Sequence, residues 1–274
     1  MLPKPRDGYP LTRDDAEHQR LAQQAAFWAP DASALFDAAG IGAGQRVADL
    51  GCGTPEVARR LAECVGPQGR VQALDSDAAL MRAQARLAST PGWLQFECGD
   101  AYATRWPDAS LDAAHARFLA APAGRLDALI AEMLRLVRPG GIVMLQEPDA
   151  CTWSLPAAGA AWQRFVALVR AAFAHRGGDF DAGLSAAQRL RAAGATQLRT
   201  RRVVHELPAR HPYARLPLSF CDSLRGSWLS AGLSTAGEID DLRLALAAAL
   251  DSAAAATTFT LVQVWARVDV ARRP

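Results

Sequence analysis

A glycine pair follows the first hydrophobic run of the chain, in the sequence Asp49-Leu50-Gly51-Cys52-Gly53. Glycine at Gly51 and Gly53 lets the backbone approach a ligand closely, because a side chain there would collide with the ligand. A dinucleotide-binding turn would have a third glycine at position 56, where this chain has Glu56, whose carboxylate would lie near two phosphate charges. The turn therefore disfavours NAD or FAD and suits an adenosyl ligand that carries a positive sulfonium and no phosphate.

Two carboxylates come after the next two hydrophobic runs. Asp75 follows the second run, at a distance from the glycine pair that suits a β-α-β unit, and could accept hydrogen bonds from both hydroxyls of a ribose. Asp100, followed by Ala101, comes after the third run and is placed to accept from the amino group of an adenine. Each aspartate alone could equally form a turn or cap a helix. At successive strand ends beside a glycine turn, the two favour a nucleoside site.

Three groups that could remove a proton are candidate general bases. His115 is predicted directly after the fourth strand, Glu147 follows the fifth strand, and His211 lies in a late segment rich in proline and aromatic residues. His115 could instead only line the ligand site. Pro148 fixes the chain between Glu147 and Asp149, so that the two carboxylates could bind an amine or an ordered water. Asp149 could alternatively cap a helix.

The elements that must position these residues alternate between short hydrophobic strands and helices. The pattern predicts strands at 46–50, 70–74, 93–97, 111–114 and 142–146, with helices at 56–65, 77–88 and 125–137. Two later strands, 197–207 and 258–267, flank a helical insertion. Such alternation is typical of the α/β class and predicts a doubly wound, mainly parallel sheet.

The chain is predicted to divide into three consecutive parts. Residues 1–40 form an N-terminal helical cap, residues 41–150 the ligand-binding core, and residues 151–274 a substrate-side half. That half contains a helical lid at 208–256 and the last two strands. Its aromatic residues could wall an apolar pocket, although aromatic residues at helical spacing more often belong to a core.

Composition excludes several classes of protein. Among 274 residues Lys4 is the only lysine, which removes enzymes that need a Schiff-base lysine, a phosphate-loop lysine or a kinase lysine. The 30 basic and 28 acidic residues balance, so a nucleic-acid partner is not expected. Five scattered cysteines without a CxxC pair disfavour a structural zinc site and indicate reduced thiols. No apolar stretch approaches the length of a membrane span, so a cytoplasmic protein without membrane attachment is expected.

These segments together resemble the class I S-adenosylmethionine-dependent methyltransferases over about residues 46–149. Residues 49–54 resemble the motif that cradles the methionine part of the cofactor, 71–75 the acidic motif that holds the ribose, and 99–101 the adenine-side motif. Residues 106–112 and 138–141 resemble the segments that lead into strands four and five. Pro55 departs from the family pattern, because a third glycine is usual there. The resemblance implies seven strands, the last of them antiparallel at 258–267.

The resemblance also implies a set of residues that contact S-adenosyl-L-methionine. A cap helix of the family closes over the cofactor, which makes Tyr9 and Gln24 candidates to touch it, although a solvated helix face and a packed tyrosine would give the same pattern. The complete predicted set is Tyr9, Gln24, Asp49, Gly51, Gly53, Asp75, Ser76, Asp100, Ala101 and His115.

The expected activity is methyl transfer from S-adenosylmethionine to a small, aromatic or amphipathic acceptor, with O-, N- and C-methylation and the oligomeric state left open. A methyltransferase of protein or RNA is a second possibility, and the balanced charge argues against RNA. A cofactor-binding regulatory subunit without activity is a third, for which Pro55 gives slight support. An NAD-dependent oxidoreductase is a fourth.

Overall fold

The computed structural model describes residues 15–87, 89–208, 210–252 and 255–269. Within these residues seven strands form one sheet in the order β3-β2-β1-β4-β5-β7-β6. The strands are β1 (Arg46–Leu50), β2 (Arg70–Asp75), β3 (Leu94–Cys98), β4 (Leu111–Arg117), β5 (Val137–Pro148), β6 (Thr196–Pro208) and β7 (Ala256–Arg267). Strands β1 to β5 pair in parallel, whereas β7 runs antiparallel to both β5 and β6. The predicted doubly wound, mainly parallel sheet with an antiparallel last strand is confirmed.

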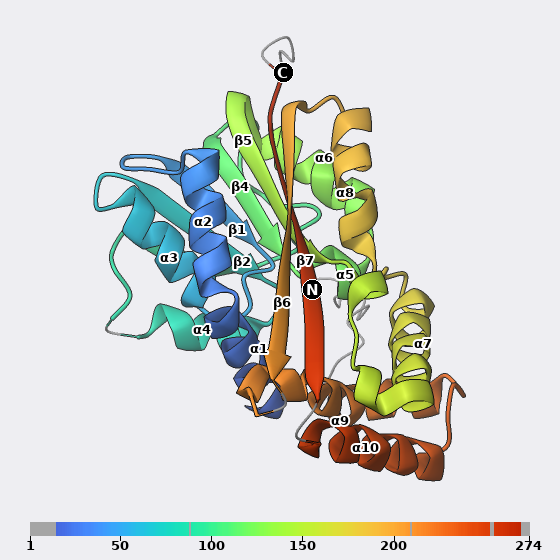
Figure 1. The fold of residues 1–274 in the computed structure, drawn as a ribbon. Helices are drawn as coiled ribbons and strands as arrows, with labels where there is room; N and C mark the ends of the chain where they lie inside the picture. The colour runs from blue at the N-terminus through green and yellow to red at the C-terminus, as the bar shows by residue number, and fades with distance from the viewer. Residues whose placement is uncertain (1–14, 88, 209, 253–254, 270–274) are drawn as a thin grey trace.

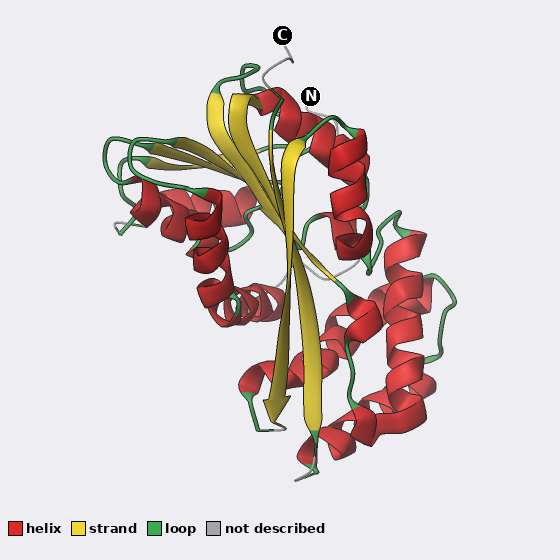
Figure 2. Cartoon of the chain, turned by 45° about the horizontal axis from the view of Figure 1, so that its top comes forward, coloured by secondary structure: helices red, strands yellow, loops and turns green. Residues whose placement is uncertain are grey.

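Helices cover both faces of the sheet (Figures 1 and 2). One face carries α2 (Ala29–Ala39), α3 (Glu56–Val65) and α4 (Ala78–Ala85), and the other carries α5 (Ala120–Ala123), α6 (Leu126–Leu136) and α8 (Ala182–Ala192). The sheet divides the hydrophobic core into two clusters, because successive strand residues point to opposite faces. Ala113 packs in one cluster and its neighbour Ala114 in the other.

A further group of helices gathers where the long strands β6 and β7 extend beyond the rest of the sheet (Figure 1). It comprises η1 (Ala150–Thr152), η2 (Pro156–Ala158), α7 (Gly159–His175), η3 (Pro212–Arg215), α9 (Leu216–Ser230) and α10 (Ala236–Asp251). Trp228 of α9 is fully buried, and its indole N–H donates to the carbonyl of Leu168 at 3.0 Å. Thr235 and Glu238 form a capping box that starts α10. Helices α9 and α10 of the predicted lid, residues 208–256, pack on α7, and the action of this segment as a lid stays a prediction.

Three predicted boundaries around the central strands are wrong by two or more residues, and one of them is the end of β5, which continues past residue 146 to Pro148 and so includes Glu147. Strand β4 continues three residues past the predicted end, because Ala116 still pairs with β1 and Arg117 still pairs with Gln146 of β5. Strand β5 begins at Val137 instead of residue 142, because Val137 pairs with Leu111 and ends the preceding helix at Leu136. The extension of β4 changes the environment of the residues at its carboxyl end.

Helix α1 (Asp15–Phe27) precedes α2 and lies beside α9 and η3. No helix among the described residues has both the length and the apolar character that crossing a membrane requires.

Candidate active site

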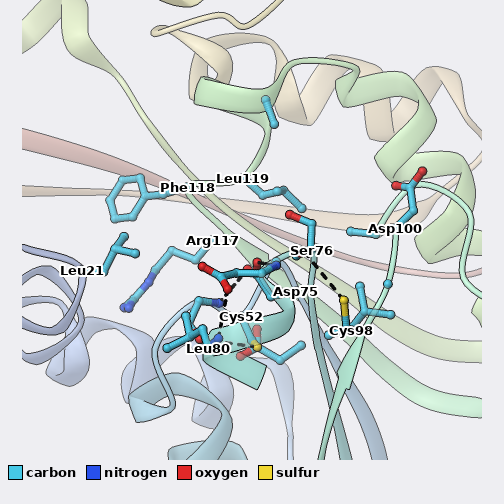
Figure 3. A pocket seen from close by; sticks show the side chains of 18 of the residues that line it. Leu21, Cys52, Asp75, Ser76, Leu80, Cys98, Asp100, Arg117, Phe118 and Leu119 are labelled. Atoms are coloured by element: carbon cyan, nitrogen blue, oxygen red, sulfur yellow. Dashed lines mark hydrogen bonds between the residues drawn. The ribbon is translucent and has the colours of Figure 1, made fainter. Parts of the chain in front are cut away.

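A cavity of about 1170 Å³ opens at the carboxyl ends of β1 to β4 (Figure 3). Parallel strands bring the residues that follow them to the same edge of a sheet, which is where ligands bind in doubly wound folds. Helix α1 contributes a further wall through Glu17, His18, Leu21 and Gln24. The other walls are the glycine loop after β1, the end of β2, the segment 97–105 and the end of β4.

The glycine loop is held in place by the neighbouring strand. The backbone N–H groups of Gly51 and Cys52 both donate to the carbonyl of Leu74, at 2.8 and 3.0 Å. Gly51 has φ +67°, and a Cβ there would lie 2.8 Å from a methyl carbon of Leu119. Gly53 has φ +53°, a conformation that residues with side chains rarely adopt. Both glycines line the cavity, as the predicted cofactor set requires.

Asp75 joins the glycine loop to the start of α4. Its Oδ2 accepts from the Gly53 N–H at 3.0 Å, and its Oδ1 accepts from the Asp77 N–H at 2.9 Å. Asp77 is the N-cap of α4, since its carboxylate accepts from the N–H groups of Ala79 and Leu80. These two bonds lower the pKa of Asp77, although burial acts in the opposite direction. Asp75 therefore both faces the cavity and fixes the shape of its wall.

The remaining predicted contacts with the adenosine part also line the cavity. Ser76 lies next to Asp75, and Asp100 and Ala101 follow β3. Asp100 accepts a hydrogen bond from the backbone N–H of Tyr102 at 2.9 Å. The structure thus brings the carboxylates at the ends of β2 and β3 into one cavity.

Asp49 and His115 form a pair, but only Asp49 lies on the cavity wall. His115 is completely buried within β4, where its Nδ1 is 2.8 Å from Asp49 Oδ1 and its Nε2 is 2.8 Å from the amide nitrogen of Gln146. The expectation that His115 directly follows the strand is wrong, because β4 continues to Arg117. The second carboxylate oxygen of Asp49 is buried and has no hydrogen-bond partner in the described part of the chain.

Glu147 is occupied by the backbone and lies away from the cavity. Its Oε1 accepts from the N–H groups of Leu119 and Ala120 at 3.0 and 2.8 Å, and its Oε2 accepts from that of Ala121 at 3.0 Å. Complete burial raises the pKa of Glu147 to about 7, although the three N–H bonds oppose this rise. Glu147 was expected after the fifth strand as a candidate general base; in the structure it lies within β5 and caps the start of α5.

His211 likewise has a local structural task. It is the N-cap of η3, where its Nδ1 accepts from the Tyr213 N–H at 3.1 Å, and its ring lies 5.5 Å from that of Phe27. It is not on the wall of the cavity that the described residues form. None of the three predicted general bases, His115, Glu147 and His211, is therefore brought to the cavity.

Asp149, two residues after Glu147 in the chain, forms an ion pair with Arg202. It is buried and accepts from Arg202, and it gives no side-chain cap to η1, so the helix-cap alternative is wrong. The ligand atoms of Asp149, Cys151 and Asp181 lie within 4.8 Å of one another, as those of a metal site would. Arg170 is 2.9 Å from Asp181, so arginines already neutralise the two carboxylates.

The cap helix places Gln24 on the cavity wall. Gln24 is buried, and its amide donates to the hydroxyl of Tyr213 at 3.5 Å. The same hydroxyl also accepts from the indole N–H of Trp28 at 2.9 Å. Burial raises the pKa of Tyr213. These bonds fix the carboxyl end of α1 over the cavity. Tyr9 lies outside the described residues.

Arg117 and His18 are among the wall residues that were not identified from the sequence. The Nη1 atom of Arg117 is inaccessible to solvent and has no hydrogen-bond partner among the described residues. Burial lowers the pKa of Arg117, and the charge of Asp49 opposes this effect. His18 of α1 brings an imidazole to the wall, with Nε2 3.5 Å from Asp77 Oδ2. The only signal in the sequence for Arg117 was a charged residue at the end of a buried strand. This signal could be recognised only if the end of β4 had been predicted correctly.

Several known proteins that resemble the chain are named as methyltransferases. The profile of the family described as "Methyltransferase domain" matches residues 47–141. Nocamycin O-methyltransferase of Saccharothrix syringae is 30% identical over 222 residues, which cover 74% of this chain and 77% of the relative. Demethylmenaquinone methyltransferase of Desulfitobacterium hafniense is 35% identical over 104 residues, 37% of this chain and 41% of the relative. The chain spans about a third to a half of the length of the first curated relatives it matches.

A solved structure with the same fold is a phosphoethanolamine N-methyltransferase of Haemonchus contortus, in complex with phosphomonomethylethanolamine and S-adenosylhomocysteine. It has a TM-score of 0.53 and 16% identity, and the match covers 88% of this chain and 52% of that one. The strand order, the cavity at the carboxyl ends of the strands and the long match to a known methyltransferase agree. The chain belongs to the class I S-adenosylmethionine-dependent methyltransferases.

Proposed function

We propose that this protein transfers a methyl group from S-adenosyl-L-methionine to a small-molecule acceptor. The observation that carries the proposal is the meeting of the glycine loop, Asp75 and Asp100 in one cavity at successive strand ends. The names of the curated relatives point to small acceptors, and the Haemonchus contortus enzyme holds S-adenosylhomocysteine. The balanced charge gives no support to a nucleic-acid acceptor.

The adenosine part of the cofactor fits the side of the cavity formed by β2 and β3. Asp75 offers carboxylate oxygens to the ribose hydroxyls while it keeps its bonds to the loop, since each oxygen has more than one lone pair. Asp100 and Ala101 follow the neighbouring strand and suit the adenine.

The amino-acid part of the cofactor fits the side of the cavity opposite to β2 and β3. Two buried polar atoms without hydrogen-bond partners support this placement. Asp49 Oδ2 and Arg117 Nη1 are both buried without partners in the described chain, and both residues line the cavity. Burying a polar atom without a partner costs about 1–3 kcal/mol, and more for a charged group. An α-amino acid supplies an ammonium for Asp49 and a carboxylate for Arg117. The residues present therefore fit the cofactor.

When bound, S-adenosylmethionine supplies an electrophilic methyl group on a sulfonium. The protein must then hold the acceptor in line with that methyl group and exclude water. Gly51 and Gly53 allow close approach of the backbone, and α1 covers the cavity. Because the three predicted bases do not reach the cavity, we infer that positioning carries most of the catalysis, with His18 the available imidazole on the wall.

The acceptor side of the cavity has an apolar and aromatic character. Phe118 and Leu119 follow β4, and Tyr102 lies beneath the guanidinium of Arg125 at 4.3 Å from ring centroid to carbon. Tyr102 donates its hydroxyl hydrogen to the carbonyl of Gly124 at 2.8 Å, which fixes the ring. These residues suit an aromatic or amphipathic metabolite.

Titration calorimetry on the full chain tests the cofactor part of the proposal. S-adenosylhomocysteine should bind saturably and NAD should not. Binding of NAD without binding of S-adenosylhomocysteine would refute the assignment. For turnover, the protein is incubated with S-adenosylmethionine and a panel of phenols, quinols and amines, and released S-adenosylhomocysteine is measured by mass spectrometry. Tight cofactor binding without release for any acceptor would favour a regulatory subunit.

A further inference from the structure

A row of buried polar side chains crosses the sheet from its edge to the cavity. Its members are Arg201 on β6, Gln263 on β7, Gln146 on β5, His115 on β4 and Asp49 on β1. These are five neighbouring strands in the order of the sheet. Apart from Arg201, at the edge, every member is at most 1% exposed. Such a buried row is costly unless every donor meets an acceptor.

The direction of each hydrogen bond in the row follows from chemistry at the edge. Arginine can only donate, so Arg201 Nε donates to Gln263 Oε1, at 2.7 Å. The amide nitrogen of Gln263 must then be the donor to Gln146 Oε1, at 2.9 Å. The same nitrogen also donates at 2.9 Å to the backbone carbonyl of Asp31, which can only accept. Two independent contacts thus fix the orientation of Gln263.

The fixed glutamines determine which nitrogen of the imidazole carries hydrogen. Since Gln146 Oε1 is already the acceptor, its amide nitrogen donates to His115 Nε2, at 2.8 Å. Nε2 therefore has no hydrogen, and the ring carries its hydrogen on Nδ1, which donates to Asp49 Oδ1 at 2.8 Å. The ring of Phe36 lies nearly perpendicular to the imidazole, with centroids 5.3 Å apart.

We propose that this row is a positioning device, in which Gln263, Gln146 and His115 hold one oxygen of Asp49 and leave the other for a cationic ligand group. The inference rests on the proposed function for the identity of that group, the ammonium of the cofactor's amino-acid part. His115 is then a positioning residue, which acts on the ligand only through Asp49. Its burial and its absence from the cavity wall are required by this role.

The tautomer of His115 gives a test that needs no ligand. Nitrogen-15 spectra of the histidine-labelled full chain at neutral pH should show one neutral imidazole with hydrogen on Nδ1, assigned by its disappearance in His115→Asn. A signal for hydrogen on Nε2, or for a doubly protonated ring, would overturn the proposal.

Two ligands separate positioning from a general structural effect. S-adenosylhomocysteine carries the ammonium, whereas 5′-methylthioadenosine lacks the whole amino-acid part. His115→Leu should weaken binding of S-adenosylhomocysteine about tenfold and that of 5′-methylthioadenosine less than twofold, because only the first ligand uses Asp49. His115→Asn, whose side-chain amide can still donate to Asp49, should restore most of the affinity. His175→Leu, at an exposed position of α7, is the matched control.

The outcomes distinguish failure of the row from failure of the proposed function. If the native protein binds neither ligand, the proposed function fails. If it binds both, and His115→Leu weakens both equally or His115→Asn gives no rescue, the positioning role is refuted while the proposed function stands. Should His115→Leu not fold, the tautomer spectrum still decides.

Discussion

Replacing Glu147 by glutamine tests the reassignment of this residue from catalysis to structure. The carboxylate accepts from three backbone N–H groups, two on one oxygen and one on the other. Glutamine keeps one acceptor oxygen but turns an NH₂ group toward at least one buried N–H donor. One unsatisfied buried donor costs about 1–3 kcal/mol of unfolding free energy. The expected result at acidic pH is destabilisation within that range.

The size of the effect should depend on pH. Burial raises the pKa of Glu147 from 4.5 to about 7, so the folded state holds the proton more tightly than the unfolded chain. The stabilisation from this group is then complete below about pH 4.5 and is lost as the pH rises through about 7. Between pH 5.5 and pH 8 this loss amounts to about 2 kcal/mol for the native protein and is absent in Glu147→Gln. The difference in unfolding free energy between the native protein and Glu147→Gln should therefore be smaller at pH 8 than at pH 5.5.

Urea unfolding at pH 5.5, 6.5 and 8 measures both quantities, with Glu63→Gln as a control at an exposed position of α3. A stability difference that is constant or grows with pH would show that the three N–H bonds outweigh burial and that the pKa is not raised. Because Leu119 both donates to Glu147 and lines the cavity, the variant should also bind S-adenosylhomocysteine more weakly. Lost turnover with unchanged cofactor affinity would instead restore Glu147 as a general base.

Three further predictions concern the cofactor wall. By calorimetry, Asp75→Ala should weaken the binding of S-adenosylhomocysteine by about 2–4 kcal/mol. Asp77→Ala removes a helix cap, so it should lower the free energy of unfolding by about 1 kcal/mol and change the affinity little. Equal losses of affinity in the two variants would contradict the assignment of Asp75 to the ribose. Gly51→Ala forces a residue with a side chain to adopt φ +67° and places its Cβ against Leu119. Thermal unfolding should show that the free energy of unfolding falls by about 1–2 kcal/mol or more. A variant as stable as the native protein would refute the close contact between Gly51 and Leu119. Mass spectrometry should show that iodoacetamide labels the exposed Cys98 on the cavity wall more slowly when S-adenosylhomocysteine is present. The exposed Cys151 is the control and should be labelled at the same rate with and without the ligand. If the ligand leaves the rate at Cys98 unchanged, it binds elsewhere.

Features set by the backbone could be predicted from the sequence. The glycine loop, Asp75 at the end of β2 and Asp100 after β3 depend on short-range patterns, since hydrophobic runs and glycine spacing indicate where each strand ends. The end of β4 could not be predicted in this way, because His115 and Arg117 look like the start of a loop. They belong to a strand because Asp49 and Gln146, 66 and 31 residues away, complete the hydrogen bonds of His115.

The same argument explains why the residue types that suit acid–base chemistry misled the choice of catalytic groups. A carboxylate near the end of a strand looks alike in sequence whether it faces a ligand or the backbone. Glu147 is fully used by three N–H groups, so it has little left to offer an acceptor. Asp49 and Arg117 instead retain buried atoms without partners in the described chain, which only a ligand or water can satisfy. In this cavity the unsatisfied atom is therefore a better guide to function than the residue type, and it depends on side-chain directions that form only when distant strands pair.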